Sequence, residues 1–183
     1  MPVLDQRSLN DMTSLIEPII PALRRYARGL VRDHSTADDL VQDCLELAVG
    51  RWHQRHADGN PRAWIFAIFH NLFRTRLRRM ARRPLHFAIE DTDEAALSID
   101  APQDQQLHFR DVLAALAQLP EEHRSVLLLV TVEDLSYAET AKVLDVPIGT
   151  VMSRLSRARA RLSEIMSGEA RRDATYPPLR RVK

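Results

Sequence analysis

A basic segment near the C-terminal end of the chain, residues 146–162, carries the residue types best suited to binding a nucleic acid. Four arginines fall within eight positions, and no acidic residue occurs from Val146 to Ser163. Arginine binds phosphate and also bonds the edge of guanine through two parallel hydrogen bonds, and serine or threonine can contact either group. A solvated helix face would usually alternate glutamate with arginine at four-residue spacing. The pattern therefore favours a DNA-binding surface over an ordinary charged helix face.

The same segment has a clear division of faces when it is wound as a helix at about 100° per residue. One narrow apolar stripe, which must face a core, consists of Val151, Leu155, Ala158 and Leu162. The polar residues lie to one side of it. We predict that the DNA-binding residues of this helix are Thr150, Ser153, Arg154, Arg157 and Arg161. Arg154, with Ser153 beside it, is predicted to read bases and Arg161 to hold phosphate, whereas Arg157 could do either.

The residues before this segment predict a shorter helix and a tight turn. Ser136 and Glu139 have the spacing of a capping box, which starts a helix at Tyr137. Pro147 disfavours the helical conformation of the residue before it, so the basic helix should begin near Gly149 or Thr150. Two short helices joined by a tight turn, the second of them basic, make a helix-turn-helix.

Charge divides the chain into two helical halves. No Asp or Glu occurs between Gly59 and Glu90, whereas the residues after Pro84 are acidic, include another proline and lose helical periodicity. With only 5 glycines in the chain and no strand-like alternation, we predict an all-α protein of two small helical domains joined by an acidic flexible linker. The predicted bounds are 1–84 for the first domain, 85–104 for the linker, 105–168 for the second domain and 169–183 for a basic, disordered tail.

Several classes of protein are disfavoured. The single cysteine, Cys44, excludes an intrachain disulfide and fits a reducing cytosol. Apolar runs such as residues 126–130 are too short to span a bilayer, and no export signal is visible, so we expect a cytoplasmic protein without membrane insertion. His53 and His56 lack neighbouring metal ligands, and no phosphate-binding glycine loop or nucleophile motif occurs. We expect no metal, no cofactor and no enzymatic activity.

Residues 119–162 resemble the C-terminal domain of bacterial RNA polymerase sigma factors of the extracytoplasmic-function (ECF) group. The resemblance lies in residues 119–120, 135–137 and 147–159, the last of which follow the group's Pro-x-Gly-Thr-Val-x-Ser-Arg-Leu-x-Arg-Ala-Arg pattern. It implies that the helix-turn-helix binds the minus-thirty-five element of a promoter. Met152 departs from the group, which usually has lysine at this position and can make a phosphate contact with it.

Residues 38–52 resemble the group's Asp-Leu-Val-Gln-Glu helix, which docks on the coiled-coil clamp of RNA polymerase. Leu40, Cys44 and Ala48 belong to a core stripe, and an acidic stripe runs beside it. An acidic face suits a basic protein partner, although taken alone the pattern fits a solvated face better. The resemblance implies that core polymerase is bound by Asp39, Gln42, Asp43 and Glu46.

Residues 60–79 resemble the group's segment that engages the melted minus-ten element. Polar and cationic side chains beside aromatic ones suit a single strand, whose backbone needs positive charge and whose bases need stacking surfaces. Phe69 is interpreted as a core residue rather than a stacking surface. The minus-ten residues that the resemblance implies are Asn60, Arg62, His70, Asn71, Arg74 and Arg78.

The resemblance as a whole implies a transcription initiation factor whose partners are core RNA polymerase, promoter DNA and an anti-sigma factor. In the group the linker threads the polymerase cleft, whereas a solvated tether explains its composition equally well. The alternative function is a sigma-like decoy that sequesters an anti-sigma factor without driving transcription. A dimeric repressor would leave residues 1–84 unexplained.

Overall fold

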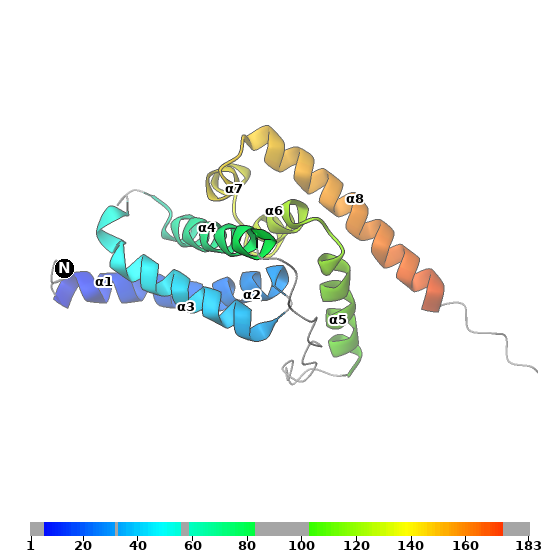
Figure 1. Cartoon of the computed structure of the whole chain (residues 1–183), viewed down its shortest axis with the longest axis horizontal. Helices are drawn as coiled ribbons and strands as arrows, with labels where there is room; N and C mark the ends of the chain where they lie inside the picture. The colour runs from blue at the N-terminus through cyan, green and yellow to red at the C-terminus, as the bar shows by residue number, and fades with distance from the viewer. Residues whose placement is uncertain (1–5, 32, 56–58, 83–102, 174–183) are drawn as a thin grey trace, which may run out of the picture.

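The computed structural model describes residues 6–31, 33–55, 59–82 and 103–173, and Figure 1 shows their arrangement. These residues form helices and no strand, which confirms the predicted all-α class. The helices of the first domain are α1 (Gln6–Ile16), the short 3-10 helix η1 (Glu17–Ile19), α2 (Ile20–Leu30), α3 (His34–Gly50), η2 (Trp52–Gln54) and α4 (Pro61–Arg82). Those of the second domain are α5 (Gln103–Ala117), α6 (Glu121–Thr131), α7 (Tyr137–Leu144) and α8 (Ile148–Asp173).

The core of the first domain lies where α2, α3 and α4 pack together. Tyr26, Phe66 and Phe69 are fully buried there, and the Tyr26 ring meets the other two edge-on at centroid distances of 5.2 and 5.5 Å. This geometry pairs the positive edge of one ring with the negative face of another. The interpretation of Phe69 as a core residue is confirmed.

Cys44 lies in the same core. Its side chain is fully buried on α3, with the sulfur 3.6 Å from the carbonyl oxygen of Ile65. Burial raises the pKa of the Cys44 thiol to about 12, because the thiolate would lose its hydration. The residue is therefore a packing group and not a nucleophile.

The beginnings of α3 and α4 follow from side chains that cap them. The carboxylate of Asp33 accepts a hydrogen bond from the backbone N–H of Thr36 at 2.7 Å. Hydrogen bonds from Thr36 and Ser35 lower the pKa of Asp33 to about 2. Asn60 accepts a bond from the backbone N–H of Arg62 at 2.9 Å, just before the proline that opens α4.

The helix-turn-helix forms as predicted. Ser136 and Glu139 make both hydrogen bonds of the capping box, and α7 ends where Asp145 adopts a left-handed conformation with φ 53°. The basic helix α8 begins at Ile148, slightly before the predicted start.

The far end of α8 corrects one prediction. The helix continues to Asp173, so the segment predicted to be a disordered tail from residue 169 begins as helix. In Figure 1, α8 is a long rod that extends away from the rest of the protein. Most of the predicted acidic linker, and residues 174–183 of the predicted tail, lie outside the described residues.

The two domains are packed against each other. Helix α4 of the first domain lies against α7, and α2 contacts both α6 and α5 of the second. Gly29 of α2 marks the closest approach, because a Cβ atom there would lie only 2.7 Å from Cδ1 of Leu128 on α6. A larger residue at position 29 would therefore require the Leu128 side chain to shift.

Candidate nucleic-acid interface

Helix α8 presents its basic side away from the core. Val151, Leu155 and Ala158 are buried as predicted, whereas Ser156 and Arg157 are exposed. Thr150 and Ser153 are half-buried, and the hydroxyl of Ser153 donates to the carbonyl of Thr150 at 3.1 Å. The outer face of α8 thus combines an exposed arginine with short hydroxyl side chains, which can approach a duplex closely.

Two of the predicted DNA-binding arginines are ion-paired within the second domain. Nη2 of Arg154 lies 2.6 Å from a carboxylate oxygen of Glu122 on α6, and Nη1 of Arg161 lies 3.1 Å from that of Glu164. The position of Arg154 explains its pair: it follows Val151 by three residues and so lies about 60° from the core stripe, whereas Arg157 lies about 120° from it. Base readout by Arg154 stays a prediction. To contact a base, the Arg154 side chain would have to leave its ion pair with Glu122.

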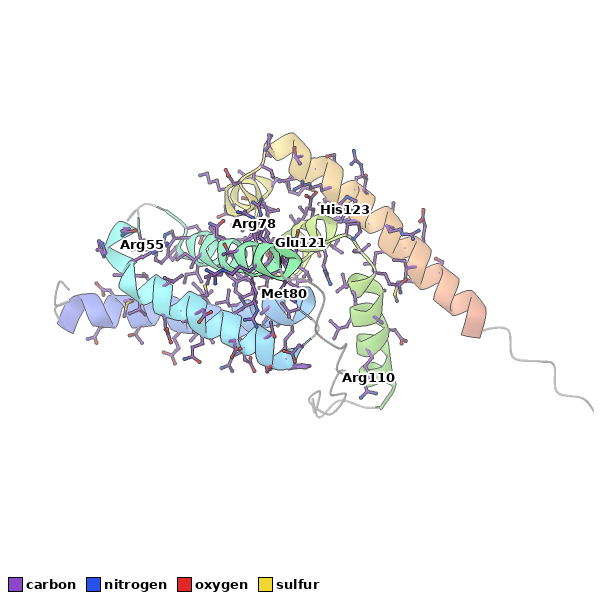
Figure 2. The ribbon with its side chains drawn as sticks, viewed as in Figure 1. Arg55, Arg78, Met80, Arg110, Glu121 and His123 are labelled. Carbon is purple, nitrogen blue, oxygen red and sulfur yellow. The ribbon has the colours of Figure 1, made fainter. Side chains whose placement is uncertain are left out.

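The residues predicted for the minus-ten element divide into two groups. Asn71 and Arg78 are exposed on α4, where Figure 2 shows Arg78 near the end of the helix. Asn60 and Arg62 instead contact the second domain. Nδ2 of Asn60 donates to Glu139 of α7, and Nη2 of Arg62 donates to Glu133, each at 2.5 Å. Asn60 stays exposed and Arg62 is half-buried, so both side chains bond to the second domain without being fully covered by it.

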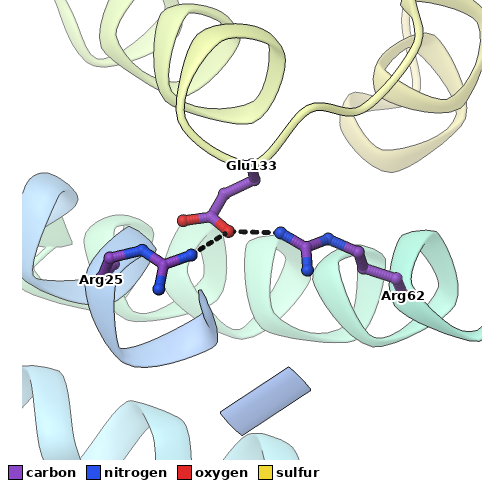
Figure 3. A network of polar contacts seen from close by, with 3 residues as sticks. All are labelled: Arg25, Arg62 and Glu133. Carbon is purple, nitrogen blue, oxygen red and sulfur yellow. Dashed lines mark hydrogen bonds and ion pairs between the residues drawn. The ribbon is translucent and has the colours of Figure 1, made fainter. Parts of the chain in front are cut away.

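Glu133 is the centre of this contact (Figure 3). Its side chain is 0% exposed, and one carboxylate oxygen accepts hydrogen bonds from Arg25 of α2, at 3.2 Å, and from Arg62 of α4. Burial raises the pKa of Glu133, while the positive charges of Arg25 and Arg62 act in the opposite direction. The guanidinium of Arg62 also lies 5.5 Å from the ring centroid of Phe66. Arg62 is thus held from both domains.

His70 lies elsewhere than the sequence suggested. A minus-ten residue should be accessible to a DNA strand, yet His70 is only 4% exposed and faces the second domain. A small cavity there is lined by His70 and Arg74 of α4 and by Glu121, Glu122 and Arg154 of the second domain. Burial, and then the charges of Arg74 and Arg154, lower the pKa of His70 to about 4, so the ring is neutral near pH 7. It can offer hydrogen bonds but no charge to a partner.

The acidic stripe of α3 is where the sequence predicted it. All four of its residues are exposed, and Gln42 donates to Glu46 at 3.0 Å along the helix. The stripe lies on the side of α3 that is opposite its buried residues Leu40, Cys44 and Ala48. The role of this acidic stripe in binding polymerase stays a prediction. The stripe consists of Asp39, Gln42, Asp43 and Glu46.

The acidic partners of this interface cannot be recognised from the sequence pattern. Glu133 lies 108 positions from Arg25 and 71 from Arg62, and Glu139 lies 79 positions from Asn60. No periodicity within a helix can reveal such pairs. The one available signal was indirect, since Glu133 lies two residues after the end of α6, whose last turns are apolar.

Two kinds of feature do not occur in the described part of the chain. No helix in it is long and apolar enough to cross a membrane, and no three or more His, Cys, Asp or Glu side chains lie together as a metal site would require.

Both domains match known protein families. Residues 16–70 match the family described as the Sigma2 domain of PhyR, and residues 109–162 match the family described as Sigma-70, region 4. The chain is 35% identical over 150 residues to the ECF RNA polymerase sigma factor EcfG of Rhodopseudomonas palustris (strain TIE-1), a match that covers 80% of each chain. It is 34% identical over 149 residues to the RNA polymerase sigma factor HrpL of Pseudomonas syringae pv. syringae, covering 79% of this chain and 81% of that protein.

Solved structures show the same similarity across both domains. The sigma factor RpoE from Bartonella quintana, in complex with the anti-sigma factor NepR, has a TM-score of 0.70 and 30% identity, covering 86% of this chain and 97% of that chain. CnrH, in complex with the cytosolic domain of CnrY, has a TM-score of 0.66 and 26% identity, covering 87% of this chain and 90% of that one.

Proposed function

Because the chain belongs to the ECF family of RNA polymerase sigma factors, we propose that it binds core RNA polymerase in the cytoplasm and directs it to specific promoters. The first domain would bind polymerase and the minus-ten element, and the second would bind the minus-thirty-five element. The observation that carries the proposal is the basic helix α8, which has no acidic residue from Ile148 to Ser163, presents an exposed outer face and belongs to a helix-turn-helix. Catalysis would belong to the polymerase, and an anti-sigma factor is the expected regulator.

Run-off transcription tests the proposal directly. The purified chain and core polymerase would be supplied with fragmented genomic DNA, and discrete transcripts that depend on the chain are the expected result. Those transcripts also identify the promoter that the other experiments need. Core polymerase that initiates equally well without the chain would contradict the proposal.

The polymerase contact is tested by reversing charge on α3. With Asp39 and Asp43 both changed to Lys, like charges would meet across the proposed contact, and co-purification with core polymerase should weaken by a few kcal/mol. Both side chains are exposed, so the fold should be kept. The matched control is the same reversal at Asp11 and Glu17, which are exposed acids outside the stripe. Equal co-purification of the two double variants would remove the stripe from the interface.

Promoter readout is tested at Arg154 and its ion-pair partner. Arg154→Ala should weaken binding by about 1–3 kcal/mol and relax the preference at one position of the minus-thirty-five element, as loss of a guanine contact does. Glu122→Ala frees Arg154 from its intramolecular partner and should tighten binding with the preference unchanged. The measurement is binding to a library of upstream elements at two salt concentrations. If Arg154→Ala keeps the preference and lowers the salt slope by about one, Arg154 holds phosphate and does not read bases.

A second candidate function is a decoy that sequesters an anti-sigma factor. The observation in its favour is that the first domain matches the family described as the Sigma2 domain of PhyR. The two candidates differ in the run-off experiment, because a decoy would bind an anti-sigma factor but give no transcript. The exposed basic face of α8, without an acidic residue from Ile148 to Ser163, favours the initiation factor, since a decoy has no need of a DNA-binding face.

A further inference from the structure

We propose that Met152 reads a thymine of the minus-thirty-five element, by packing its side chain against the methyl group that thymine carries at C5. Ile148, one helical turn earlier, would extend the same apolar contact. The inference rests on the proposed function, because it takes α8 to enter the major groove of that element. It adds a specificity-determining residue of a kind that arginine cannot supply, since thymine is the one base that presents a methyl group in the groove.

The first argument is that two large apolar side chains are exposed at the start of α8. Met152 is 48% exposed and Ile148 is 46% exposed, the highest values among the large apolar residues in the described part of the second domain. The two residues are four positions apart, so they are neighbours on one side of the helix. Apolar surface of this kind gains free energy when a partner removes it from water.

The second argument is that this pair lies beside the part of α8 that can approach DNA most closely. Counted from the buried Val151 at about 100° per residue, Met152 lies on the flank of the helix opposite to that of Arg154. The outer face between the two flanks begins with Gly149 and Ser153, and a Cβ atom at Gly149 would meet open space. Because these outermost residues are short, the helix can lie deep in the groove. Its first turns, which contact bases in helix-turn-helix proteins, then bring both flanks to the base edges.

The third argument selects DNA as the partner of this apolar pair. Exposed arginines continue the same surface: Arg159 follows Met152 by seven residues on the same flank, and Arg157 lies next to the outer face. A surface that combines cations with apolar atoms matches the major groove, where phosphates border the base edges and the thymine methyl is the apolar group. Met152 has no charge with which to hold a phosphate. Its unbranched, flexible side chain can instead adapt to the position of a methyl group.

Removal of single methyl groups from the DNA tests the contact directly. Deoxyuridine pairs as thymidine does but lacks the C5 methyl group. Each thymidine of the minus-thirty-five element found by run-off transcription would be replaced in turn by deoxyuridine, and the complex of the chain with core polymerase would be tested for binding to each duplex. At one position we expect binding to be about four-fold weaker without the methyl group, which is the usual effect of burying one such group.

Two variants of Met152 should lose this response to the methyl group. Met152→Ala should bind the thymine and uracil duplexes equally at that position. Met152→Lys should also fail to distinguish them, and its added charge should raise the salt slope by about one. Both variants should keep the fold, because the side chain they replace is exposed. The matched control is Met80→Ala, the same change at a methionine of α4 that is 63% exposed, and it should respond to uracil as the unmodified chain does.

The inference is overturned if Met152→Ala and the unmodified chain respond alike to uracil at every position, since no methyl group would then contact Met152. The same result, together with weaker co-purification of Met152→Ala with core polymerase, would assign the apolar pair to a protein contact and would equally overturn the inference. If the unmodified chain gives no transcript and its mixture with core polymerase binds no duplex, the proposed function itself fails, and the inference falls with it.

Discussion

Replacing Phe69 by alanine will lower the free energy of unfolding of the protein by about 3–5 kcal/mol, the usual cost of removing a fully buried aromatic ring. Phe69 is 0% exposed, and its ring packs edge-on against Tyr26 at the centre of the first domain. The cavity left behind is walled by helices that cannot close on it. Since domains of this size are stable by only about 5–15 kcal/mol, much of the folded population will be lost at physiological temperature. Urea unfolding followed by circular dichroism measures the effect.

Asn71→Ala is the matched control for this prediction. Asn71 lies two residues further along α4 and is exposed, so its loss should change the stability by no more than about 0.5 kcal/mol. It should nevertheless weaken binding of the minus-ten strand, if that prediction is right. The interpretation of Phe69 fails if Phe69→Ala remains as stable as the unmodified protein and loses only strand binding, because the ring would then be a stacking surface.

Reversing the charge of Glu133 will separate the two domains. In Glu133→Lys, an ammonium group would replace the fully buried carboxylate between Arg25 and Arg62. A buried charge left without a counter-charge costs about 3–5 kcal/mol, and here two cations would face it directly. Separation relieves this cost, because all three groups regain water. Small-angle scattering should show a larger radius of gyration, and circular dichroism should show unchanged helix content.

The control for this second experiment is Glu164→Lys. It makes the same change of charge in the same domain, but Glu164 is 67% exposed at the surface of α8. Its scattering profile should match that of the unmodified protein. A compact profile for Glu133→Lys would show that the polar contact does not hold the domains together, and that apolar packing around Gly29 and Leu128 is sufficient.

Features of the fold that depend on neighbours in the sequence were predicted correctly. The capping box at Ser136 and the break before Pro147 act over three residues or fewer, and the apolar stripe of α8 depends only on helical spacing. The identification of two sigma-factor domains relied on such local patterns. The all-α class followed from them as well, and the family matches support both domains.

The candidate site was predicted less well, because the spacing of residues on a helix cannot show what covers each face. His70 and Asn71 are neighbouring polar residues of α4, yet His70 is buried against the second domain and Asn71 is exposed. Arg154 belongs to the basic face of α8 by sequence, and a glutamate from α6 holds it. In both cases the deciding neighbour comes from a distant segment. Such contacts follow from the packing of domains, about which a single sequence carries little information.

Because Cys44 is buried, the rate at which its thiol is labelled reports the opening of the first domain in the native protein. Cys44 is the single cysteine of the chain, and its side chain is buried between α3 and α4. Burial raises the pKa of its thiol to about 12. A thiol reagent can attack only molecules whose first domain has opened, because the reactive species is the exposed thiolate. The rate of labelling therefore counts opening events of that domain in the unmodified chain. Separation of the two domains without unfolding would leave this rate unchanged, so the two motions can be followed independently in one sample.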